Sequence, residues 1–314
     1  MSWSLIFETL RFELISNFLR YFLVAAAFFA MFWVWGLWPA RRIQARRPSL
    51  ARMRSEVWWS MSTVLVFSLV GLLNTLAIKA GWTRVYFAIG ERGATGFVTS
   101  LVLMVVLHDA YFYWTHRLLH HHVFFERFHR VHHLSTTPTP WAAYSFHPVE
   151  ALVQAGIFPL LVFVVPAHPL ALFLFLLYMI VRNVVGHLGV EIFPRGFVGQ
   201  SWTRWHTTTI HHDLHHRDFR SNYGLYFGWW DTLLGTEHPE YRRAFHAVTR
   251  RGRGIEPPAA VPAVGGSILD PENGKEYRSA VWLEGPDRLR VRGYWGPFYR
   301  SQTWHRLKKN GGRP

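Results

Sequence analysis

The chain contains 19 histidines, and most of them lie between positions 108 and 216 at spacings that suit metal binding. HRVHH at residues 129–133 and HDLHH at residues 212–216 share the pattern His-x-x-His-His. His116 and His120 are four positions apart, and so are Asn183 and His187. Residues three or four positions apart lie on one face of an α-helix, so each group can direct its side chains to one point.

These groups supply more imidazoles than one metal ion can bind, because an ion takes at most six ligands. The sequence therefore predicts two ions. The chain has no cysteine, so the ligands must be nitrogen or oxygen, and imidazole suits zinc, copper, iron or nickel. A thiol-free site for two ions at a membrane surface favours iron that reacts with O2 and an apolar substrate. The predicted ligands are His116, His120, His129, His132, His133, His187, His212, His215 and His216.

Polar residues near these groups are predicted either to support the metal ligands or to lie at the edge of the site. Asp109 lies within about 20° of the stripe of His116 and His120 on a helix, so it can bind metal or hold a ligand. Four further histidines are expected at the rim of the site, namely His121, His122, His206 and His211. A histidine-rich tract that merely buffers metal would be contiguous, whereas these histidines recur on helical faces in separate segments.

The elements that must position the histidines are apolar helices, because the chain is 50% hydrophobic and 17% aromatic. Residues 21–40 and 57–78 carry no charge, and each block is long enough to cross a bilayer. A third block covers residues 94–107 and continues to residue 115. A fourth block, residues 151–181, is broken by Pro159, Pro166 and Pro169, which predicts a short hairpin of two helices. We expect an all-α integral membrane protein with four to five transmembrane helices.

Charge predicts the orientation of these helices. Six arginines fill residues 41–56, which the positive-inside tendency places in the cytoplasm. Residues 80–93 are then outside, while residues 116–148 and 188–314 are cytoplasmic, so both His-x-x-His-His motifs belong to one cytosolic helical cap. The net charge of +15 fits a basic belt beside anionic lipid better than nucleic-acid binding.

The chain divides into three predicted parts. Residues 1–93 form N-terminal transmembrane helices and loops, residues 94–245 a catalytic domain, and residues 246–314 a basic cytosolic tail. The tail begins with a linker-like run at residues 257–266 and continues with two strand-like runs, residues 277–283 and 288–294, around a Gly-Pro-Asp turn. We expect a small β-hairpin there and assign it no chemistry.

The motifs HDAYFYWTHRLLHH, HRVHH, HHDLHH and NYGLYFGWWDTLLGT resemble the sterol desaturase and fatty acid hydroxylase superfamily. Its members are integral membrane proteins with a histidine-bound di-iron centre, and the likeness covers roughly residues 50–245. TPTPWAAYSFHPVEA (137–151) and GHLGVEIFP (186–194) look most like the sterol C-5 desaturase, or lathosterol oxidase, branch.

The resemblance implies three histidine boxes: His116 with His120, the histidines of HRVHH, and those of HDLHH. It matches His187 to the lone histidine that ends the membrane hairpin. Where Asn183 stands, the fatty acid hydroxylase branch usually has a histidine, so either Asn183 or His147 completes the ligand set. We favour Asn183 beside the open coordination site and His147 as a support. Asp109, Glu150 and Asp213 are candidates to accept imidazole N–H groups.

The activity implied by the resemblance is desaturation of a lipid, most closely a sterol, by two iron ions with O2 as co-substrate. Zinc can replace iron in preparations. Hydroxylation of a fatty acyl, sphingoid or alkylglycerol chain is the alternative, because both reactions share one ligand set. A metal transporter or storage protein is a third hypothesis, which predicts carboxylates or histidines that form a path at mid-depth of the bilayer. The first two predicted spans hold none.

The electrons for such a reaction must come from another protein. The His-Pro-Gly-Gly segment of a fused cytochrome b5 and the G-x-G-x-x-G fingerprint of a dinucleotide site are both missing. We expect a separate carrier supplied by NAD(P)H, which is cytochrome b5 in the endoplasmic reticulum or a ferredoxin at a bacterial inner membrane. The lipid, the donor and the oligomeric state do not follow from the sequence.

Overall fold

The computed structural model describes residues 2–251, 264–269, 276–285, 288–295 and 298–305. Its contacts divide the chain into two compact units, Met1–Gly252 and Arg253–Pro314. The first unit is helical and carries all of the clustered histidines. The second contains a β-sheet.

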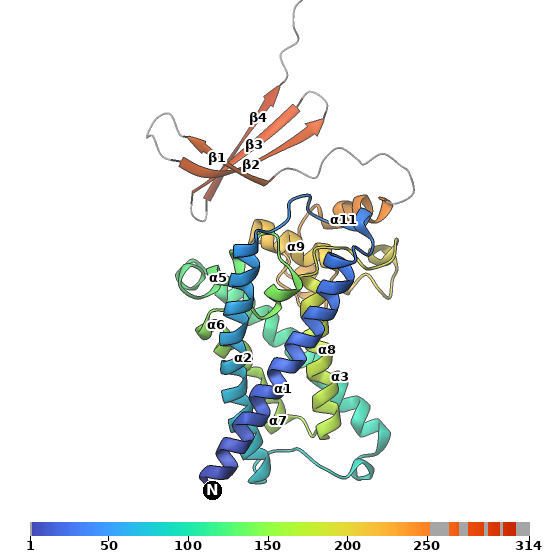
Figure 1. The fold of residues 1–314 in the computed structure, drawn as a ribbon. Helices are drawn as coiled ribbons and strands as arrows, with labels where there is room; N and C mark the ends of the chain where they lie inside the picture. Colours follow the sequence, from blue (N-terminus) through green and yellow to red (C-terminus); the bar gives the residue numbers. More distant parts are fainter. Residues whose placement is uncertain (1, 252–263, 270–275, 286–287, 296–297, 306–314) are drawn as a thin grey trace, which may run out of the picture. The chain divides into compact units, whose positions relative to one another are not determined.

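Four helices of the first unit are long and apolar enough to cross a membrane: α1 (Trp3–Phe29, continued by the π-helical turn Ala30–Val34), α2 (Leu50–Lys79), α3 (Gly93–Leu119) and α8 (Pro169–Gly186). They run between the two ends of the unit (Figure 1). Large apolar side chains such as Phe7, Leu73 and Phe173 are exposed along them. Contiguous exposed apolar surface of this kind marks contact with lipid. The chain is an integral membrane protein.

The first helix is longer than the apolar block at residues 21–40 indicated. It begins at Trp3, where the Ser2 hydroxyl accepts a hydrogen bond from the Leu5 amide, and it includes Glu8 and Glu13. The expectation that the first two spans hold no ionisable group was therefore wrong. Thr75 of α2 donates a hydrogen bond to Glu13 at 2.7 Å, so this carboxylate joins α1 to α2.

The proline-broken block forms a hairpin of three helices: α6 (Pro148–Ala155), α7 (Ile157–Val164) and α8. Two of them start with proline at the first helical position, which suits that residue because its missing N–H has no partner there. Histidines precede both prolines: the His147 and His168 rings accept hydrogen bonds from the Val149 and Leu170 amides. The count of four long helices with one shorter apolar pair agrees with the expected four to five.

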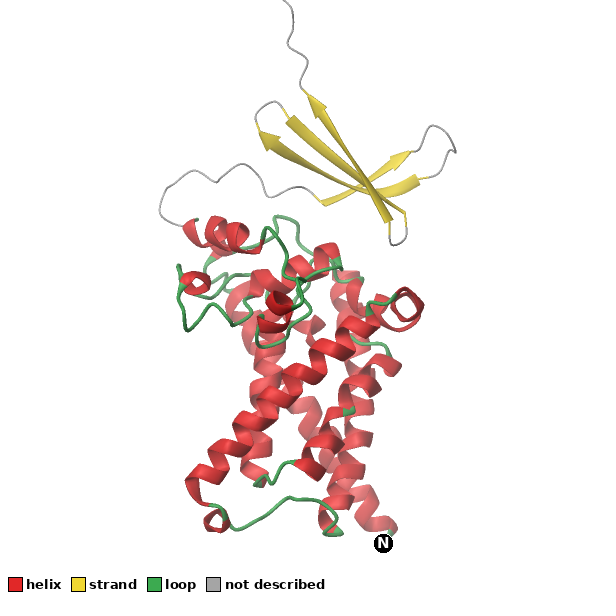
Figure 2. Ribbon diagram, turned by 180° about the vertical axis from the view of Figure 1, so that it is seen from behind, coloured by secondary structure: helices red, strands yellow, loops and turns green. Residues whose placement is uncertain are grey.

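Short helices and loops form a cap at the end where α3 and α8 terminate (Figures 1 and 2). Besides the single turn η3 (Ile89–Glu91) at the opposite end, the short elements are η2 (Pro39–Arg41), α4 (His122–Phe124), η4 (Phe125–His129), α5 (Arg130–His133), η5 (Pro140–Tyr144), η6 (Phe197–Gly199), α9 (Thr209–Asp218), α10 (Trp229–Leu233) and α11 (Tyr241–Arg250). The arginine-rich loop belongs to the cap, because the Ile43 amide bonds to the Gly189 carbonyl at 3.0 Å and the Gln44 amide to Asp213 at 2.9 Å.

A buried core between α1, α2 and α8 fixes the cap to the membrane helices. Tyr21 of α1 stacks on Tyr144 and donates a hydrogen bond to the Trp141 carbonyl at 2.9 Å. Ser60 of α2 donates to the same carbonyl at 3.0 Å. These contacts hold the segment between α5 and α6, and so they position the histidines that flank it.

The second unit contains four antiparallel strands in the order β1 (Val264–Leu269), β2 (Glu276–Gly285), β3 (Arg288–Trp295) and β4 (Phe298–His305). Val281 faces Val291 across β2 and β3, and Leu289 faces Trp304 across β3 and β4. The two predicted runs lie within β2 and β3, and two further strands flank them. Two residues of the predicted turn, 286 and 287, and most of the predicted linker lie outside the described residues.

Candidate metal centre

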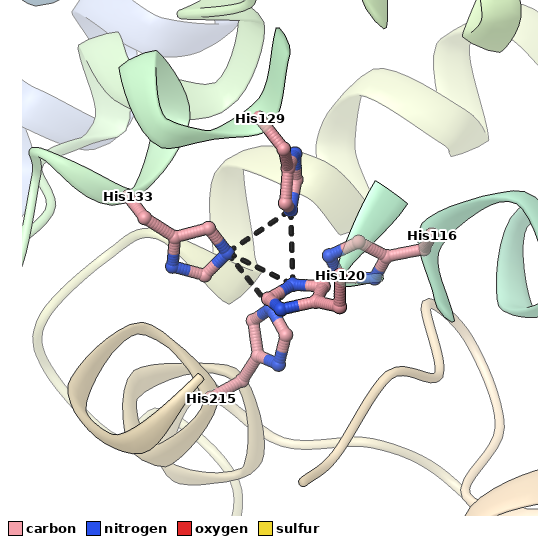
Figure 3. A group of neighbouring side chains, drawn as sticks. All are labelled: His116, His120, His129, His133 and His215. Atoms are coloured by element: carbon pink, nitrogen blue, oxygen red, sulfur yellow. Dashed lines mark hydrogen bonds between the residues drawn. The ribbon is translucent and has the colours of Figure 1, made fainter. Parts of the chain in front are cut away.

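Five histidines from three segments meet in one cluster (Figure 3). We name it the five-histidine cluster: His116, His120, His129, His133 and His215. The first two come from the end of α3, the next two from η4 and α5, and the last from α9. One nitrogen of each ring lies within 4.8 Å of the corresponding nitrogen of every other. The segments are up to 99 positions apart in sequence.

Four more histidines form a second group, the four-histidine cluster: His132, His187, His212 and His216. Their ligand nitrogens also lie within 4.8 Å of one another. The two clusters are neighbours, since the His133 and His216 rings are 4.8 Å apart and the His132 and His133 rings 5.4 Å. All nine histidines singled out from the sequence are in these two groups.

Each His-x-x-His-His motif is divided between the clusters, which the sequence did not indicate. His129 and His133 point into the five-histidine cluster, whereas His132 belongs to the other. In the second motif, His212 and His216 lie in the four-histidine cluster and His215 in the first. The outer pair of each motif, four positions apart, shares one side of its helix, while the histidine at the fourth position reaches the adjacent side. The expectation that each triplet converges on one point was wrong, and the adjacent histidines serve two points.

Several rings have their hydrogen positions fixed by a partner at Nδ1. His116 donates to the Tyr223 carbonyl at 3.0 Å, His215 to the Ser221 carbonyl at 2.7 Å and His187 to the Asn183 carbonyl at 2.8 Å. A carbonyl only accepts hydrogen bonds, so each of these rings carries its proton on Nδ1. The Nε2 atom of each ring then directs a lone pair into the cluster.

The contacts between Nε2 atoms test whether the clusters fit a metal. The Nε2 atoms of His120, His129 and His133 are mutually 3.0–3.1 Å apart, which closes a triangle. In a neutral imidazole each Nε2 is either a donor or an acceptor. Two of any three must therefore be alike, so at least one side of the triangle brings together two lone pairs or two N–H groups.

The four-histidine cluster contains the same conflict. The Nε2 atoms of His187, His212 and His216 are 3.1–3.2 Å apart, and His187 presents a lone pair to both of the others. A cation at the centre resolves every contact, because all of the nitrogens then act as lone-pair ligands. Two nitrogens bound about 2.1 Å from one ion are about 3 Å apart when their bonds meet near a right angle. The donor sets therefore fit one metal ion in each cluster.

Burial keeps these rings in the form that binds metal. Removal from water lowers the pKa of His187 to about 4. It also lowers the pKa values of the other ligands in the cap well below the usual value, namely His120, His129, His132, His133, His212, His215 and His216. The imidazoles are therefore neutral at physiological pH, with lone pairs available.

Of the three carboxylates expected to orient imidazoles, one does so. Glu150 Oε1 lies 2.7 Å from His129 Nδ1, and both side chains are buried. The expectation was wrong for Asp109, which accepts hydrogen bonds from the Tyr226 and Phe227 amides and the Trp229 indole. Asp213 instead accepts one from Gln44.

The two residues considered for a tenth ligand lie in different places. His147 caps α6 and packs beside Trp59 and Phe128, and it belongs to neither cluster. The Asn183 amide donates to the Ala143 carbonyl at 2.7 Å. Asn183 also lines a small cavity with His212, a member of the four-histidine cluster.

A loop that leads into the NYGLYFGWWDTLLGT motif, to which the sequence reasoning assigned no role at the metal, holds the five-histidine cluster from one side. It supplies the carbonyls of Ser221 and Tyr223, and Asp231 fixes it by accepting hydrogen bonds from the Tyr223 and Gly224 amides at 2.9 and 2.8 Å. The Asn-x-Gly pattern at residues 222–224 with a following aspartate is the signal that could have pointed to it. His211, expected at the rim, is buried and lies 3.4 Å from Asp231.

Comparison with known proteins agrees with this geometry. The family model described as Fatty acid hydroxylase matches residues 101–236, the segment that contains all nine clustered histidines. Residues 101–236 are thus similar to this family. A second family model, described as an uncharacterized protein conserved in bacteria (DUF2147), matches residues 253–306.

Several curated proteins that the chain resembles are named as sterol enzymes. A Delta(7)-sterol 5(6)-desaturase of Gibberella zeae is 33% identical over 186 residues, which cover 59% of this chain and 56% of the relative. Lathosterol oxidase of Mus musculus is 31% identical over 202 residues, 62% of each chain. Methylsterol monooxygenase 1 of Rattus norvegicus is 30% identical over 146 residues, 46% of this chain and 47% of the relative. The chain thus spans less than two thirds of the length of these relatives. No solved structure matches it.

Proposed function

We propose that the chain is a membrane-bound non-haem di-iron oxidoreductase that uses O2 to desaturate neighbouring C–H bonds of a lipid. The observation that carries the proposal is the pair of closed triangles of Nε2 atoms, which only a cation in each cluster relieves. The names of the sterol desaturase relatives support a sterol as the lipid.

Iron is the metal that suits this donor set and reaction. The clusters offer five and four nitrogens and no thiolate, so an ion with six positions keeps room for oxygen. Two iron ions held by these histidines would supply the redox chemistry that converts O2 and external electrons into an oxidant of unactivated C–H bonds.

The chain's own residues hold the ligands and keep the site dry. The Glu150 carboxylate and the carbonyls of Asn183, Ser221 and Tyr223 fix the tautomers of four ligands and so fix the direction of their lone pairs. Asn183 shares a cavity with His212, and we propose it as the side chain beside the open coordination position. Because the ligand rings are buried, bulk water is excluded from the reaction.

We further propose that the cap faces the cytoplasm, since the arginine-rich loop is part of it. Electrons then reach the clusters from a soluble or membrane-attached carrier on that side, cytochrome b5 in the endoplasmic reticulum or a ferredoxin at a bacterial inner membrane, reduced by NAD(P)H. Exposed arginines of the cap would attract an acidic carrier.

Lipid hydroxylation is the second candidate. It is favoured by the match to the fatty acid hydroxylase family and by the similarity to a methylsterol monooxygenase. The mass of the product separates the two reactions, because desaturation removes two hydrogens whereas hydroxylation adds one oxygen. Lipid extracts of a host with and without the gene, compared by mass spectrometry, identify both the substrate and the reaction.

The metal assignment is tested by substituting one ligand in each cluster. His132→Ala and His215→Ala should each lose iron and lipid oxidation while the protein remains in the membrane, because each removes a nitrogen from one ion. His147→Ala is the matched control, since this histidine lies in neither cluster, and it should keep its iron. Normal turnover by either of the first two variants would refute the assignment.

A further inference from the structure

Aromatic rings form a continuous row from the five-histidine cluster to the protein surface. The Tyr223 ring lies 5.1 Å from the ring of His120 and 5.5 Å from that of His215. The Tyr113 ring lies 6.2 Å further along. Both tyrosines are buried, so the row starts inside the protein, against two of the proposed metal ligands.

Two tryptophans continue the row outward. Trp230 of α10 stacks on Tyr113 with ring centroids 5.9 Å apart and an interplanar angle of 24°. The Trp114 ring of α3 lies 6.0 Å from that of Trp230 and 5.6 Å from that of Tyr113, so it is in reach of Tyr113 directly as well as through Trp230, and 50% of its surface is exposed. No step between neighbouring rings exceeds 6.2 Å, so each ring is in reach of the next.

Tyr113 has a hydrogen-bonded route for its phenolic proton. Its hydroxyl lies 2.9 Å from Thr236 Oγ1, and the Thr236 hydroxyl in turn donates to Asp231 Oδ1 at 2.7 Å. Because the single proton of Thr236 points to Asp231, Tyr113 is the donor in the first contact. Loss of an electron from a tyrosine makes its hydroxyl strongly acidic, so a carboxylate reached through one hydroxyl allows the ring to be oxidised without leaving a buried charge.

Tyrosine and tryptophan are the most readily oxidised side chains, along with the sulfur-containing ones. Their oxidised forms are nevertheless far stronger oxidants than the carriers that feed oxidases, so a low-potential carrier does not deliver electrons by oxidising these rings in turn. Only a strong oxidant draws electrons through such a row. The proposed reaction generates such an oxidant from O2, and without a lipid in place it would attack the ligands themselves.

We propose that Tyr223, Tyr113, Trp230 and Trp114 form an escape route that carries oxidising equivalents from the five-histidine cluster to the surface when no lipid is bound. This inference rests on the proposed di-iron function and adds a protective activity to it. The Tyr223 ring is the packed bridge between the ligands and Tyr113.

Electrons and protons balance in each passage. Tyr113 gives one electron to the oxidant at the cluster, and its phenolic proton moves to Thr236 as the Thr236 proton moves to Asp231. Trp230 then returns one electron to Tyr113, the proton returns with it, and Trp114 reduces Trp230. A thiol in solution reduces Trp114. Two passages consume two electrons from two thiols, which release two protons and join as a disulfide.

The test uses the full-length membrane protein loaded with iron and treated with hydrogen peroxide, which supplies the oxidising equivalents without a lipid or an electron donor. Peptide mass spectrometry then measures the oxidation of Trp114. Trp202 is the internal control, because it is more exposed, at 74%, yet lies outside the row. Zinc-loaded protein is the second control, because zinc has no redox chemistry.

In the native protein, Trp114 should be oxidised in an iron-dependent way and Trp202 should not. Tyr113→Phe keeps aromatic bulk but interrupts the row at the ring that both tryptophans contact, so most Trp114 oxidation should be lost and oxidation of cluster histidines should increase, with bound iron unchanged at the start. Trp230→Phe leaves the direct contact between Tyr113 and Trp114 in place and should lower Trp114 oxidation less. The proposal is overturned if Trp114 is oxidised no more than Trp202, or if Tyr113→Phe oxidises Trp114 as the native protein does.

The test of the aromatic row gives a result that does not depend on whether the proposed lipid oxidation is correct. Lipid product formation with O2 tests the oxidase, whereas peroxide tests the row without turnover. Iron-dependent Trp114 oxidation without any lipid product would overturn the reaction but leave the row in place. Normal lipid oxidation with Trp114 oxidation that does not depend on Tyr113 would do the reverse.

Discussion

Glu150 offers the sharpest test of how the chain tunes the five-histidine cluster. Its carboxylate receives the Nδ1 proton of His129 at 2.7 Å, and both groups are almost completely buried. A negative partner makes the opposite nitrogen of the ring a better metal ligand. Glu150→Gln keeps the size and one acceptor oxygen but removes the charge, so it should weaken iron binding at this cluster.

The magnitude follows from the kind of hydrogen bond that is changed. A buried hydrogen bond to a charged group contributes about 1.5–3 kcal/mol, whereas a neutral one contributes about 0.5–1.5 kcal/mol. The substitution should therefore cost about 1–2 kcal/mol of binding free energy, or roughly 5- to 30-fold in affinity. The second carboxylate oxygen of Glu150 is buried without a partner. Loss of the charge should thus leave the metal-free fold as stable as before, or more stable.

The assay is an anaerobic competition titration of ferrous iron between the purified protein and a chromogenic chelator. Asp213→Asn is the matched control, because Asp213 is an equally buried carboxylate next to a ligand but bonds to Gln44 rather than to an imidazole. It should leave the affinity unchanged. The reasoning is refuted if Glu150→Gln binds both ions as tightly as the native protein, or if the control weakens binding to the same extent.

Three further outcomes are expected. A Cβ at Gly186 would lie 3.3 Å from the His212 ring, so Gly186→Ala should displace this ring and weaken iron binding about tenfold. The expected overpacking cost is about 1–3 kcal/mol. Gly199→Ala is the control and should leave iron binding unchanged, because nothing lies within 4 Å of a Cβ there. Asp109→Asn turns an N–H group towards the donors at Tyr226, Phe227 or Trp229 and should lower the free energy of unfolding by about 1–3 kcal/mol, measured by chemical denaturation; unchanged stability would contradict the anchoring role. Iron added below one equivalent should give metal-free and two-iron protein in native mass spectra, and a dominant one-iron species would show that the clusters fill independently.

The histidines of the two clusters could be predicted from the sequence because their grouping depends largely on local geometry. Spacings of three and four residues place imidazoles on one helical face whatever the tertiary structure, and the absence of cysteine limits the chemistry to nitrogen and oxygen. The division of each motif between two clusters could not be read in this way. Whether His132 serves the same ion as His133 depends on where His187 lies, and that residue is 55 positions from His132, directly after α8.

The partners of the buried carboxylates show the same limit. Asp109 shares a helical stripe with His116, so the local pattern favoured a role at the metal. The structure brings the backbone of residues 226 and 227 to its carboxylate instead, because two unpaired amides in a buried loop need an acceptor. The sequence analysis placed the start of the first helix too far along the chain for a similar reason. Charged Arg20 bounds the uncharged block in the sequence, but the helix continues through it to Trp3, and Thr75 of a neighbouring helix accommodates Glu13.

The interleaved motifs also explain why the histidines occur in adjacent pairs. α5 supplies His133 to one cluster and His132 to the other, and α9 does the same with His215 and His216. An ion in either cluster therefore fixes both short helices, and these helices carry ligands of the second ion. The second binding event then costs less conformational entropy than the first. In the proposed reaction two ions act together on one O2, so both are needed at the same time, and shared helices of this kind would couple their binding without any contact between the ions.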